Sequence, residues 1–149
     1  MRTKTDDIEG VLSYTHRDST EFVNTSTELF CSVLRENGGP PRLRLHIQYV
    51  ADEWLFVREF TFKADEKTFN VDPSRFGGMK RDNGDGKIWE WCNCPVDDEL
   101  KANLLSIAGS RSAVIRFEGD KYNKDIRITE TEKNRIRTVL EVYDILSKE

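Results

Sequence analysis

Apolar and polar residues alternate through the first two thirds of the chain, and this alternation predicts β-strands. The pattern is clearest at 42–50, where polar side chains separate four apolar ones: Leu43, Leu45, Ile47 and Tyr49. Residues 10–16 and 28–36 are also strand-like, and "NGGPP" at 37–41 predicts a loop. Because a half-buried strand turns one face to water, we expect the side chains between the apolar ones, including His46, to be solvated.

The segment "EWLFVREFTFKA" at 53–64 is rich in aromatic residues but changes its alternation partway. Leu55 and Val57 fall on one parity, whereas Phe60 and Phe62 fall on the other. Either both faces of one strand are buried, or a bulge near residues 58–59 shifts the register.

Two hairpins follow from the positions of turn residues. "ADEK" at 64–67 predicts a tight turn that leads into "KTFNV". Residues 112–119 and 124–129 form a second hairpin across "DKYN", with Ala113, Ile115 and Phe117 directed to the core. Antiparallel pairing therefore dominates the predicted sheets.

The segment "PVDDELKANLLSIAG" predicts the first helix. Asp97 is the expected N-cap, and Gly109 is the expected stop. The expected apolar face consists of Leu100, Leu104, Leu105 and Ala108.

The last helix has a stronger start signal, because Thr129 and Glu132 form a T-x-x-E capping box. One apolar stripe runs along it: Ile136, Val139, Leu140, Tyr143 and Leu146. Together these elements predict a single α+β domain over residues 1–149. We expect an antiparallel, sandwich-like β-sheet system with two helices, the second at the C-terminus.

Composition narrows the class of protein. The 149 residues carry a net charge of -4, with 34% charged and 37% hydrophobic residues, which is typical of a globular domain. This weak acidity argues against general nucleic-acid binding, and no apolar run is long enough to span a membrane. "MRTKTDDIEG" has no apolar segment, so the chain as given is expected in the cytoplasm. A secreted or periplasmic protein whose signal peptide had been removed would show the same pattern.

"RDNGDGKIWEW" at 81–91 resembles a calcium-binding loop but does not supply the ligands that such a loop needs. Placing Gly86 at the sixth position puts Arg81 at the first and Cys92 at the twelfth, where an EF-hand needs carboxylates. Asn-Gly and Asp-Gly pairs are also the residues that tight hairpins favour. We therefore predict a hairpin turn and expect neither a metal nor a cofactor.

The chain shows no catalytic signature. Cys31, Cys92 and Cys94 are too few for a disulfide scaffold, and His16 and His46 have no metal-ligand spacing. Cys92 and Cys94 share one face of a predicted strand and are expected to be a reduced thiol pair. A site dispersed in sequence around these thiols, His46 and nearby acids remains an alternative.

Five residues are candidates for binding a partner: Trp89, Trp91, Tyr122, Arg116 and Arg44. Exposed on a sheet, the two indoles would form a recognition surface, but we expect them to pack under a helix, with Trp54 as a competing core residue. The arginines of the predicted strands would form a basic patch if their faces coincided; an ordinary solvated face with neighbouring acids is favoured. These strand arginines are Arg42, Arg44, Arg58, Arg116 and Arg127.

From about residue 9 onward, several phrases resemble a bacterial family of small secreted or lipid-anchored proteins. The phrases are "GVLSYTHRDSTEFVN", "QYVADEWLF", "RDNGDGKIWEW", "IRFEGDKYNKD" and "ITETEK", followed by "VLEVYD". The resemblance implies a fold but no activity or cofactor. This chain lacks the signal peptide and lipobox cysteine of the lipoprotein form, and a phage-encoded relative would fit that difference equally well.

The leading hypothesis is a non-enzymatic binding or interaction module, of bacterial or phage origin, for a protein or a small polar ligand. One alternative is a phage or mobile-element effector that inhibits a host defence protein or sequesters a charged small molecule. A second is a small hydrolase or transferase with a dispersed site. The first is favoured because the caps, turns and periodicities agree with one another while reaction motifs are missing.

Overall fold

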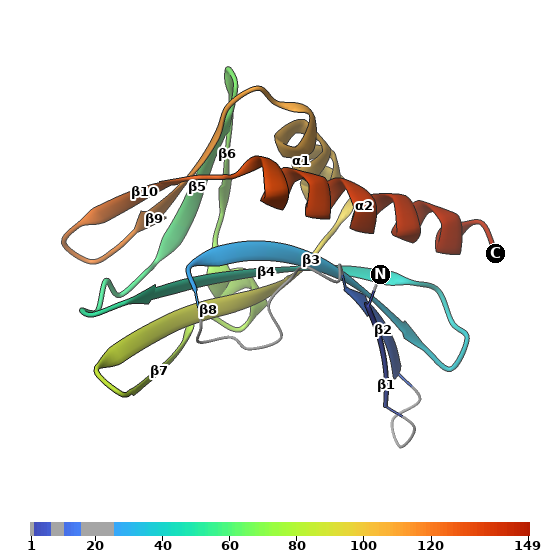
Figure 1. Ribbon diagram of the computed structural model, residues 1–149, viewed down its shortest axis with the longest axis horizontal. Helices are drawn as coiled ribbons and strands as arrows, with labels where there is room; N and C mark the ends of the chain where they lie inside the picture. The colour runs from blue at the N-terminus through green and yellow to red at the C-terminus, as the bar shows by residue number, and fades with distance from the viewer. Residues whose placement is uncertain (1, 7–10, 16–25) are drawn as a thin grey trace.

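The computed structural model describes residues 2–6, 11–15 and 26–149, which form two antiparallel β-sheets and two α-helices (Figure 1). This arrangement confirms the predicted α+β class, with the second helix at the C-terminus. The sheets approach each other at one end of the molecule, where the ring centroids of Tyr49 and Phe117 are 5.4 Å apart. They diverge toward the other end, where the helices lie.

The larger sheet has the strand order β1-β2-β3-β4-β8-β7, with every neighbouring pair antiparallel. Its strands are β1 (Arg2–Asp6), β2 (Val11–Thr15), β3 (Glu28–Glu36), β4 (Arg42–Ala51), β7 (Lys80–Gly84) and β8 (Lys87–Pro95). β7 and β8 are joined by the predicted hairpin, in which Asp85 and Gly86 both have positive φ angles. An Asp-Gly pair adopts this conformation at low cost, so the turn has a steric explanation.

The smaller sheet has the order β10-β9-β5-β6. Its strands are β5 (Glu59–Ala64), β6 (Lys67–Val71), β9 (Ala113–Glu118) and β10 (Asn123–Arg127). Both predicted hairpins are confirmed, because β5 pairs with β6 and β9 pairs with β10. A short 3₁₀ helix, η1 (Pro73–Phe76), leads from β6 toward β7 and is capped by the Asp72 side chain.

Residues 53–64 do not form one strand, and neither explanation offered for their change of parity is correct. Only residues 59–64 are β-strand; residues 52–58 connect the two sheets. Phe56 has a φ of 55°, a left-handed conformation that is rare for an aromatic residue. The parity changes because the chain leaves one sheet and enters the other, and Leu55 and Val57 are buried in the connection.

Helix α1 (Asp98–Gly109) begins as predicted, because the Asp97 side chain accepts a hydrogen bond from the Leu100 amide. Gly109 is the last helical residue, and Ser110 is the C-cap in an extended conformation. The predicted apolar face is partly wrong: Leu105 is 50% exposed, whereas Ile107 is fully buried. The burial of Ile107 reflects packing between layers, which helical periodicity alone did not resolve.

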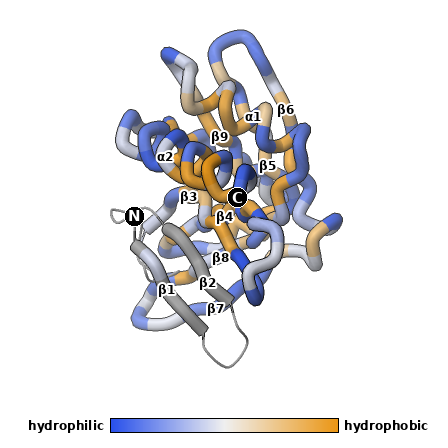
Figure 2. The backbone as a smooth tube through the Cα atoms, turned by 90° about the vertical axis from the view of Figure 1, so that its right-hand side faces the viewer, coloured by the Kyte–Doolittle hydropathy of each residue, from blue (hydrophilic) through white to orange (hydrophobic). Residues whose placement is uncertain are grey.

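Helix α2 (Glu130–Ser147) has the predicted capping box, in which Thr129 and Glu132 bind each other's backbone amides. Ile136, Val139 and Leu140 are fully buried, so the predicted stripe faces the core. The helix lies beside β3 on the inner face of the larger sheet and packs against α1 (Figure 1). The core fills the space between helices and sheets, where the hydrophobic segments gather (Figure 2).

The expectation of a solvated face on β4 is wrong for two residues. His46 is 6% exposed and Gln48 is fully buried. The His46 ring stacks on Phe30, and its two nitrogens lie 2.6 Å from Asn93 Oδ1 and 2.9 Å from Gln48 Oε1. Gln48 also donates to the Ser26 carbonyl. These polar side chains can be buried because hydrogen bonds satisfy them.

Candidate functional site

Three connections meet at the end of the molecule where the two sheets approach each other (Figure 1). They are the inter-sheet connection at 52–58, the β7–β8 turn and the β9–β10 turn. Connections at one end of a sheet scaffold are a common location for binding residues, because the strands hold them in place. We call this region the loop end.

A buried carboxylate anchors the inter-sheet connection. Glu90 Oε2 accepts hydrogen bonds from the amides of Leu55 and Phe56, at 3.0 and 3.1 Å, and Oε1 accepts one from the Val57 amide at 2.9 Å. Arg81 Nε donates to Oε1 at 2.8 Å. Glu90 is completely buried, so these four charge-assisted hydrogen bonds compensate the cost of removing its charge from water.

The β9–β10 turn is also tied to the inter-sheet connection. The Asp120 amide donates to the Leu55 carbonyl at 3.2 Å, and the Gly119 amide donates to the Tyr122 carbonyl at 2.9 Å. A Cβ atom on Gly119 would lie 2.3 Å from the Leu55 carbonyl oxygen. Only glycine permits this close approach, so the backbones of the two connections are held against each other.

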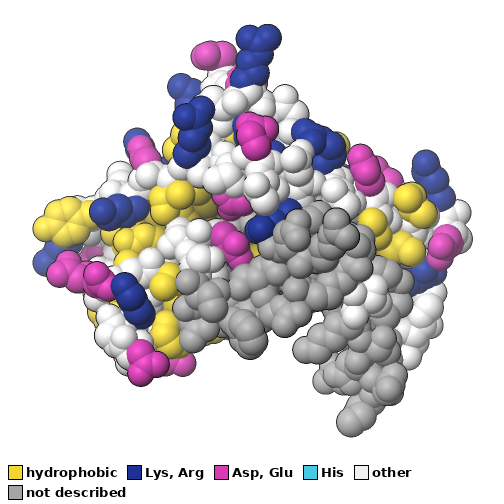
Figure 3. Space-filling view, in the orientation of Figure 1, with side chains coloured by type: hydrophobic (Ala, Val, Ile, Leu, Met, Phe, Trp, Pro, Cys, Tyr) yellow, Lys and Arg dark blue, Asp and Glu magenta, His cyan; other side chains and the backbone are white. Residues whose placement is uncertain are grey.

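Several aromatic side chains belong to this scaffold, and hydrophobic surface is visible at the left of Figure 3. Trp54 stacks on Phe56, with ring centroids 5.8 Å apart. The Arg81 guanidinium lies over the Phe56 ring, 5.8 Å from the ring centroid. Phe56 is 49% exposed and Tyr122 is 72% exposed. Exposed apolar side chains that gather on one surface, rather than being scattered singly, are candidates for contact with a ligand or partner.

Two of these rings, those of Trp54 and Tyr122, border a hollow of about 520 Å³, which we call the loop-end hollow. Its lining comprises Tyr49, Ala51, Asp52, Glu53, Trp54, Leu55, Tyr122, Asn123 and Lys124. A second hollow of about 320 Å³, the side hollow, lies over the β7–β8 turn and shares Asp52 and Trp54 with the first. Trp54 therefore stands between the two hollows.

Tyr49 contributes a polar group to the loop-end hollow. The residue is 7% exposed, and its hydroxyl has no hydrogen-bond partner among the residues that the structure describes. Burial, followed by the nearby carboxylates of Glu90 and Glu53, raises the pKa of this hydroxyl. It is therefore neutral at physiological pH and can both donate and accept a hydrogen bond.

The five residues proposed from the sequence lie in three different places. Only Tyr122 lines the loop-end hollow. Trp89, Trp91 and Arg44 lie on the outer face of the larger sheet, and Arg116 lies on the outer face of the smaller sheet. They do not form one site.

The expectation that Trp89 and Trp91 pack under a helix is wrong. Both are half-buried on the face of β8 opposite Cys92 and Cys94, which belong to the core between sheet and helices. Trp89 instead lies over Gly84, where a Cβ atom would be 3.4 Å from the indole. Trp54 takes the role that sequence reasoning offered as the alternative, because it packs against the core.

The arginines of the predicted strands do not share one face either. Arg42 and Arg44 belong to the larger sheet, whereas Arg116 and Arg127 belong to the smaller one. Three of the five are paired with acids, in the ion pairs Arg42–Glu36, Arg58–Asp120 and Arg116–Asp125. The second nitrogen contact of Arg116, at 3.0 Å, makes its pair with Asp125 bidentate. The favoured expectation of solvated arginines with neighbouring acids is therefore confirmed for these pairs.

The thiols and His46 lie on opposite faces of the larger sheet, so they do not assemble into a catalytic group. Cys92 and Cys94 have Sγ atoms 3.3 Å apart in the core, and His46 bonds to Asn93 on the outer face. The hydrogen bond between the Cys92 and Cys94 thiols lowers the pKa of Cys92 and raises that of Cys94. Burial raises the pKa of Cys31 to about 12. All three thiols are buried.

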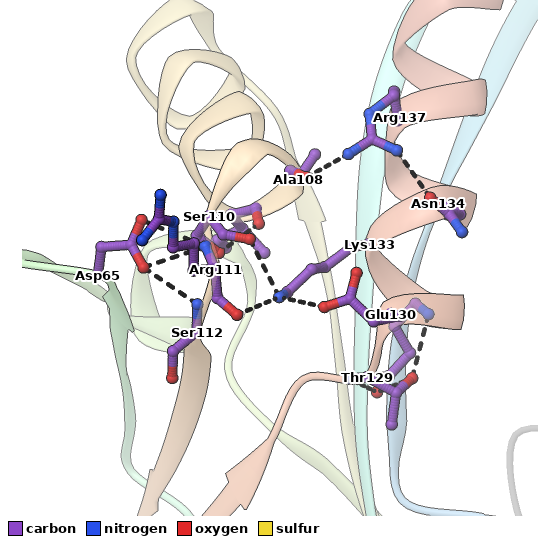
Figure 4. A network of polar contacts seen from close by, with 12 residues as sticks. Asp65, Ala108, Ser110, Arg111, Ser112, Thr129, Glu130, Lys133, Asn134 and Arg137 are labelled. Atoms are coloured by element: carbon purple, nitrogen blue, oxygen red, sulfur yellow. Dashed lines mark hydrogen bonds and ion pairs between the residues drawn. The ribbon is translucent and has the colours of Figure 1, made fainter.

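The buried Lys133 belongs to a structural junction between α2 and the C-terminal end of α1 (Figure 4). Its Nζ donates to the carbonyls of Ser110 and Arg111 and to Glu130, at 3.1, 3.2 and 2.8 Å. Arg137 donates to the Ala108 carbonyl, so two cations of α2 bind the C-terminal end of α1. Because the ammonium group has three acceptors, it is saturated and is not available as a reactive amine.

Within the part of the chain that the structure describes, no group of three or more His, Cys, Asp or Glu side chains could hold a metal ion. The helices described there include none that is long and apolar enough to cross a membrane.

No protein-family model, curated protein sequence or solved structure matches this chain. The resemblance to small secreted or lipid-anchored bacterial proteins therefore stays a prediction. Sequence reasoning identified Tyr122 but missed Tyr49, Glu53 and Lys124 as possible contacts. The available signal was the density of aromatic and charged residues in "YVADEWLF" at 49–56, next to a change of strand parity.

Proposed function

We propose that this protein is a non-enzymatic binding module that captures a small polar ligand in the loop-end hollow. The proposal rests on one observation: the rings of Tyr49, Trp54 and Tyr122, together with polar side chains that have no partner among the described residues, surround a hollow whose walls are fixed by hydrogen bonds. A concave site with aromatic surface and a few polar groups is the usual form of a small-molecule site.

The rigidity of the walls supports binding in particular. Glu90 fixes the backbone of residues 55–57, and Gly119 brings the β9–β10 turn against it. A ligand that enters a preorganised site does not have to order the protein, so less of the interaction energy is lost.

The polar groups of the hollow are more consistent with binding than with catalysis. Glu53 and Lys124 have no ion-pair partner among the described residues, and neither is placed beside a nucleophilic thiol or a histidine. A general acid or base needs a neighbouring group that positions it and shifts its pKa. Side chains without such a neighbour can instead provide hydrogen bonds to a ligand.

The test is a ¹⁵N–¹H correlation spectrum of the whole chain, titrated separately with four sets of compounds. The sets are neutral oligosaccharides, amino acids, nucleotides and polyamines. We expect one set to shift the amides of residues 49–55 and 122–124 in a saturable manner. If no set perturbs these amides, the proposed function is wrong.

Two variants separate binding in the hollow from weak contact elsewhere. Tyr122→Ala removes an exposed ring of the hollow, and Ile145→Ala removes a side chain of similar exposure, 62%, from α2. We expect the first to weaken binding about fivefold or more and the second to leave it unchanged. Equal affinities of the two variants would exclude the hollow as the site.

A further inference from the structure

The charges around the loop-end hollow are already balanced. Asp52 pairs with Lys87 at 2.5 Å, which leaves Glu53 and Lys124 with opposite charges and no partner among the described residues. A phosphate or carboxylate ligand needs a cluster of cations, preferably arginines, and a cationic ligand needs an excess of acids. Isolated exposed charges contribute little to affinity in water. The hollow therefore suits a ligand without net charge.

The hydrogen-bonding groups suit hydroxyls. The Tyr49 hydroxyl and the Asn123 side-chain amide can each donate and accept, and neither has a partner among the residues described. Glu53 adds acceptors and Lys124 adds donors. Sugar hydroxyls also donate and accept, so they can satisfy all four of these side chains.

The aromatic rings suit the apolar faces of sugar rings. A hexose has C–H groups on its faces and hydroxyls around its rim, so it can lie on an indole or phenol ring while its rim forms hydrogen bonds. Tyrosine and tryptophan provide such surfaces with a polar edge. Stacking on Phe56 fixes the position of the Trp54 ring, and the Arg81 guanidinium lies over the Phe56 ring.

The side hollow extends this surface beyond Trp54. Among the described residues, neither the Asn83 amide group nor the Asp85 carboxylate has a side-chain partner there. Polar groups thus lie on both sides of one aromatic ring. A single hexose would occupy one hollow, whereas a longer chain would contact both.

We infer that the loop end binds a neutral oligosaccharide of at least two hexose units, laid across Trp54 between the two hollows. This inference rests on the proposed binding function and specifies its ligand class.

The experiment titrates the whole protein with neutral α- and β-linked hexose oligomers of one to four units, followed by tryptophan fluorescence and ¹⁵N–¹H spectra. We expect affinity to rise about fivefold or more from one unit to three, with shifts at 83–87 joining those at 49–55 and 122–124 as the chain grows. Because the ligand is neutral, affinity should change less than about twofold between low and high salt.

Three variants assign the two hollows. Tyr122→Ala should weaken every oligomer, Asn83→Ala should weaken only the longer ones, and the control Ile145→Ala should weaken none. A monosaccharide that binds as tightly as the tetrasaccharide would overturn the extended site. Equal losses for short and long oligomers in Asn83→Ala would overturn the role of the side hollow.

The failure of this inference is distinguishable from failure of the proposed function. If amino acids, nucleotides or polyamines shift the loop-end amides and sugars do not, the saccharide inference is wrong and the binding module stands. Sugar-induced shifts confined to other surfaces would also overturn the inference. If no compound of any class perturbs the loop end, both are wrong.

Discussion

Replacing Glu90 with glutamine should destabilise the protein and release the inter-sheet connection. The substitution preserves the size of the side chain but replaces one carboxylate oxygen with an NH₂ group. If the NH₂ group takes the Oε2 position, it faces the amides of Leu55 and Phe56, which are themselves donors. If it takes the Oε1 position, it faces the Val57 amide and Arg81 instead. Either orientation leaves two buried donors without an acceptor.

The expected magnitude follows from these lost bonds. Each unsatisfied buried donor costs about 1–3 kcal/mol, and either orientation leaves two donors without their acceptor. The Arg81 side chain is 34% exposed, so water partly replaces the acceptor it loses. We therefore expect a loss of about 2–5 kcal/mol. A domain of ordinary stability, about 5–15 kcal/mol, would remain folded in most cases and could be measured.

The assay is equilibrium unfolding in urea, with Glu66→Gln as a control at an exposed carboxylate in the β5–β6 turn. The control should change stability by less than about 0.5 kcal/mol. Hydrogen exchange adds a local readout, because the amides of residues 55–57 should lose protection before the strands do. A Glu90→Gln protein within about 1 kcal/mol of the parent would refute the view that this carboxylate holds the loop end together.

Four further outcomes are expected. Gly119→Ala should lower the unfolding free energy by more than about 2 kcal/mol, because its Cβ would clash with the Leu55 carbonyl. Gly109→Ala has open space around its Cβ and should be neutral or stabilising by up to about 1 kcal/mol. Chemical denaturation measures both variants. Lys133→Met should lower the Tm measured by calorimetry by about 4 °C or more, because the carbonyls of Ser110 and Arg111 lose their buried donor. An unchanged Tm would show that the junction between α1 and α2 is dispensable. The three buried thiols should react with iodoacetamide at neutral pH far more slowly than free cysteine, and a fast thiol detected by mass spectrometry would contradict this. The hydrogen bond from Arg116 lowers the pKa of the exposed Asp125. The small stabilising contribution of this pair is therefore present above the ordinary aspartate pKa and disappears as the pH falls through the lowered value. NMR titration should show that the Asp125 midpoint rises in Arg116→Gln.

The sequence by itself determined the features that depend on near neighbours in the chain. The capping box of Thr129 and Glu132, the Asp97 cap and the Asp-Gly hairpin turn all form within a few residues. The periods of apolar residues identified both helices and most strands, because each element must present one face to the core. The α+β class followed from the order of these elements.

Tertiary structure decided which side chains meet, and therefore where the candidate site lies. Glu90 and the amides of residues 55–57 are more than thirty positions apart, so no local pattern connects them. The burial of His46, the outward position of the tryptophans on β8 and the exposure of Leu105 depend on which layer covers each face.

The difference between local pattern and tertiary contact also explains why the binding residues proposed from the sequence do not form one site. Parity along a strand showed that Trp89 and Trp91 share a face, but it could not show which face meets the helices. Tyr49, Trp54 and Tyr122 surround one hollow only because the two sheets approach each other at that end. Residue type and spacing record local conformational preference, whereas a binding site depends on contacts between segments that are distant in sequence.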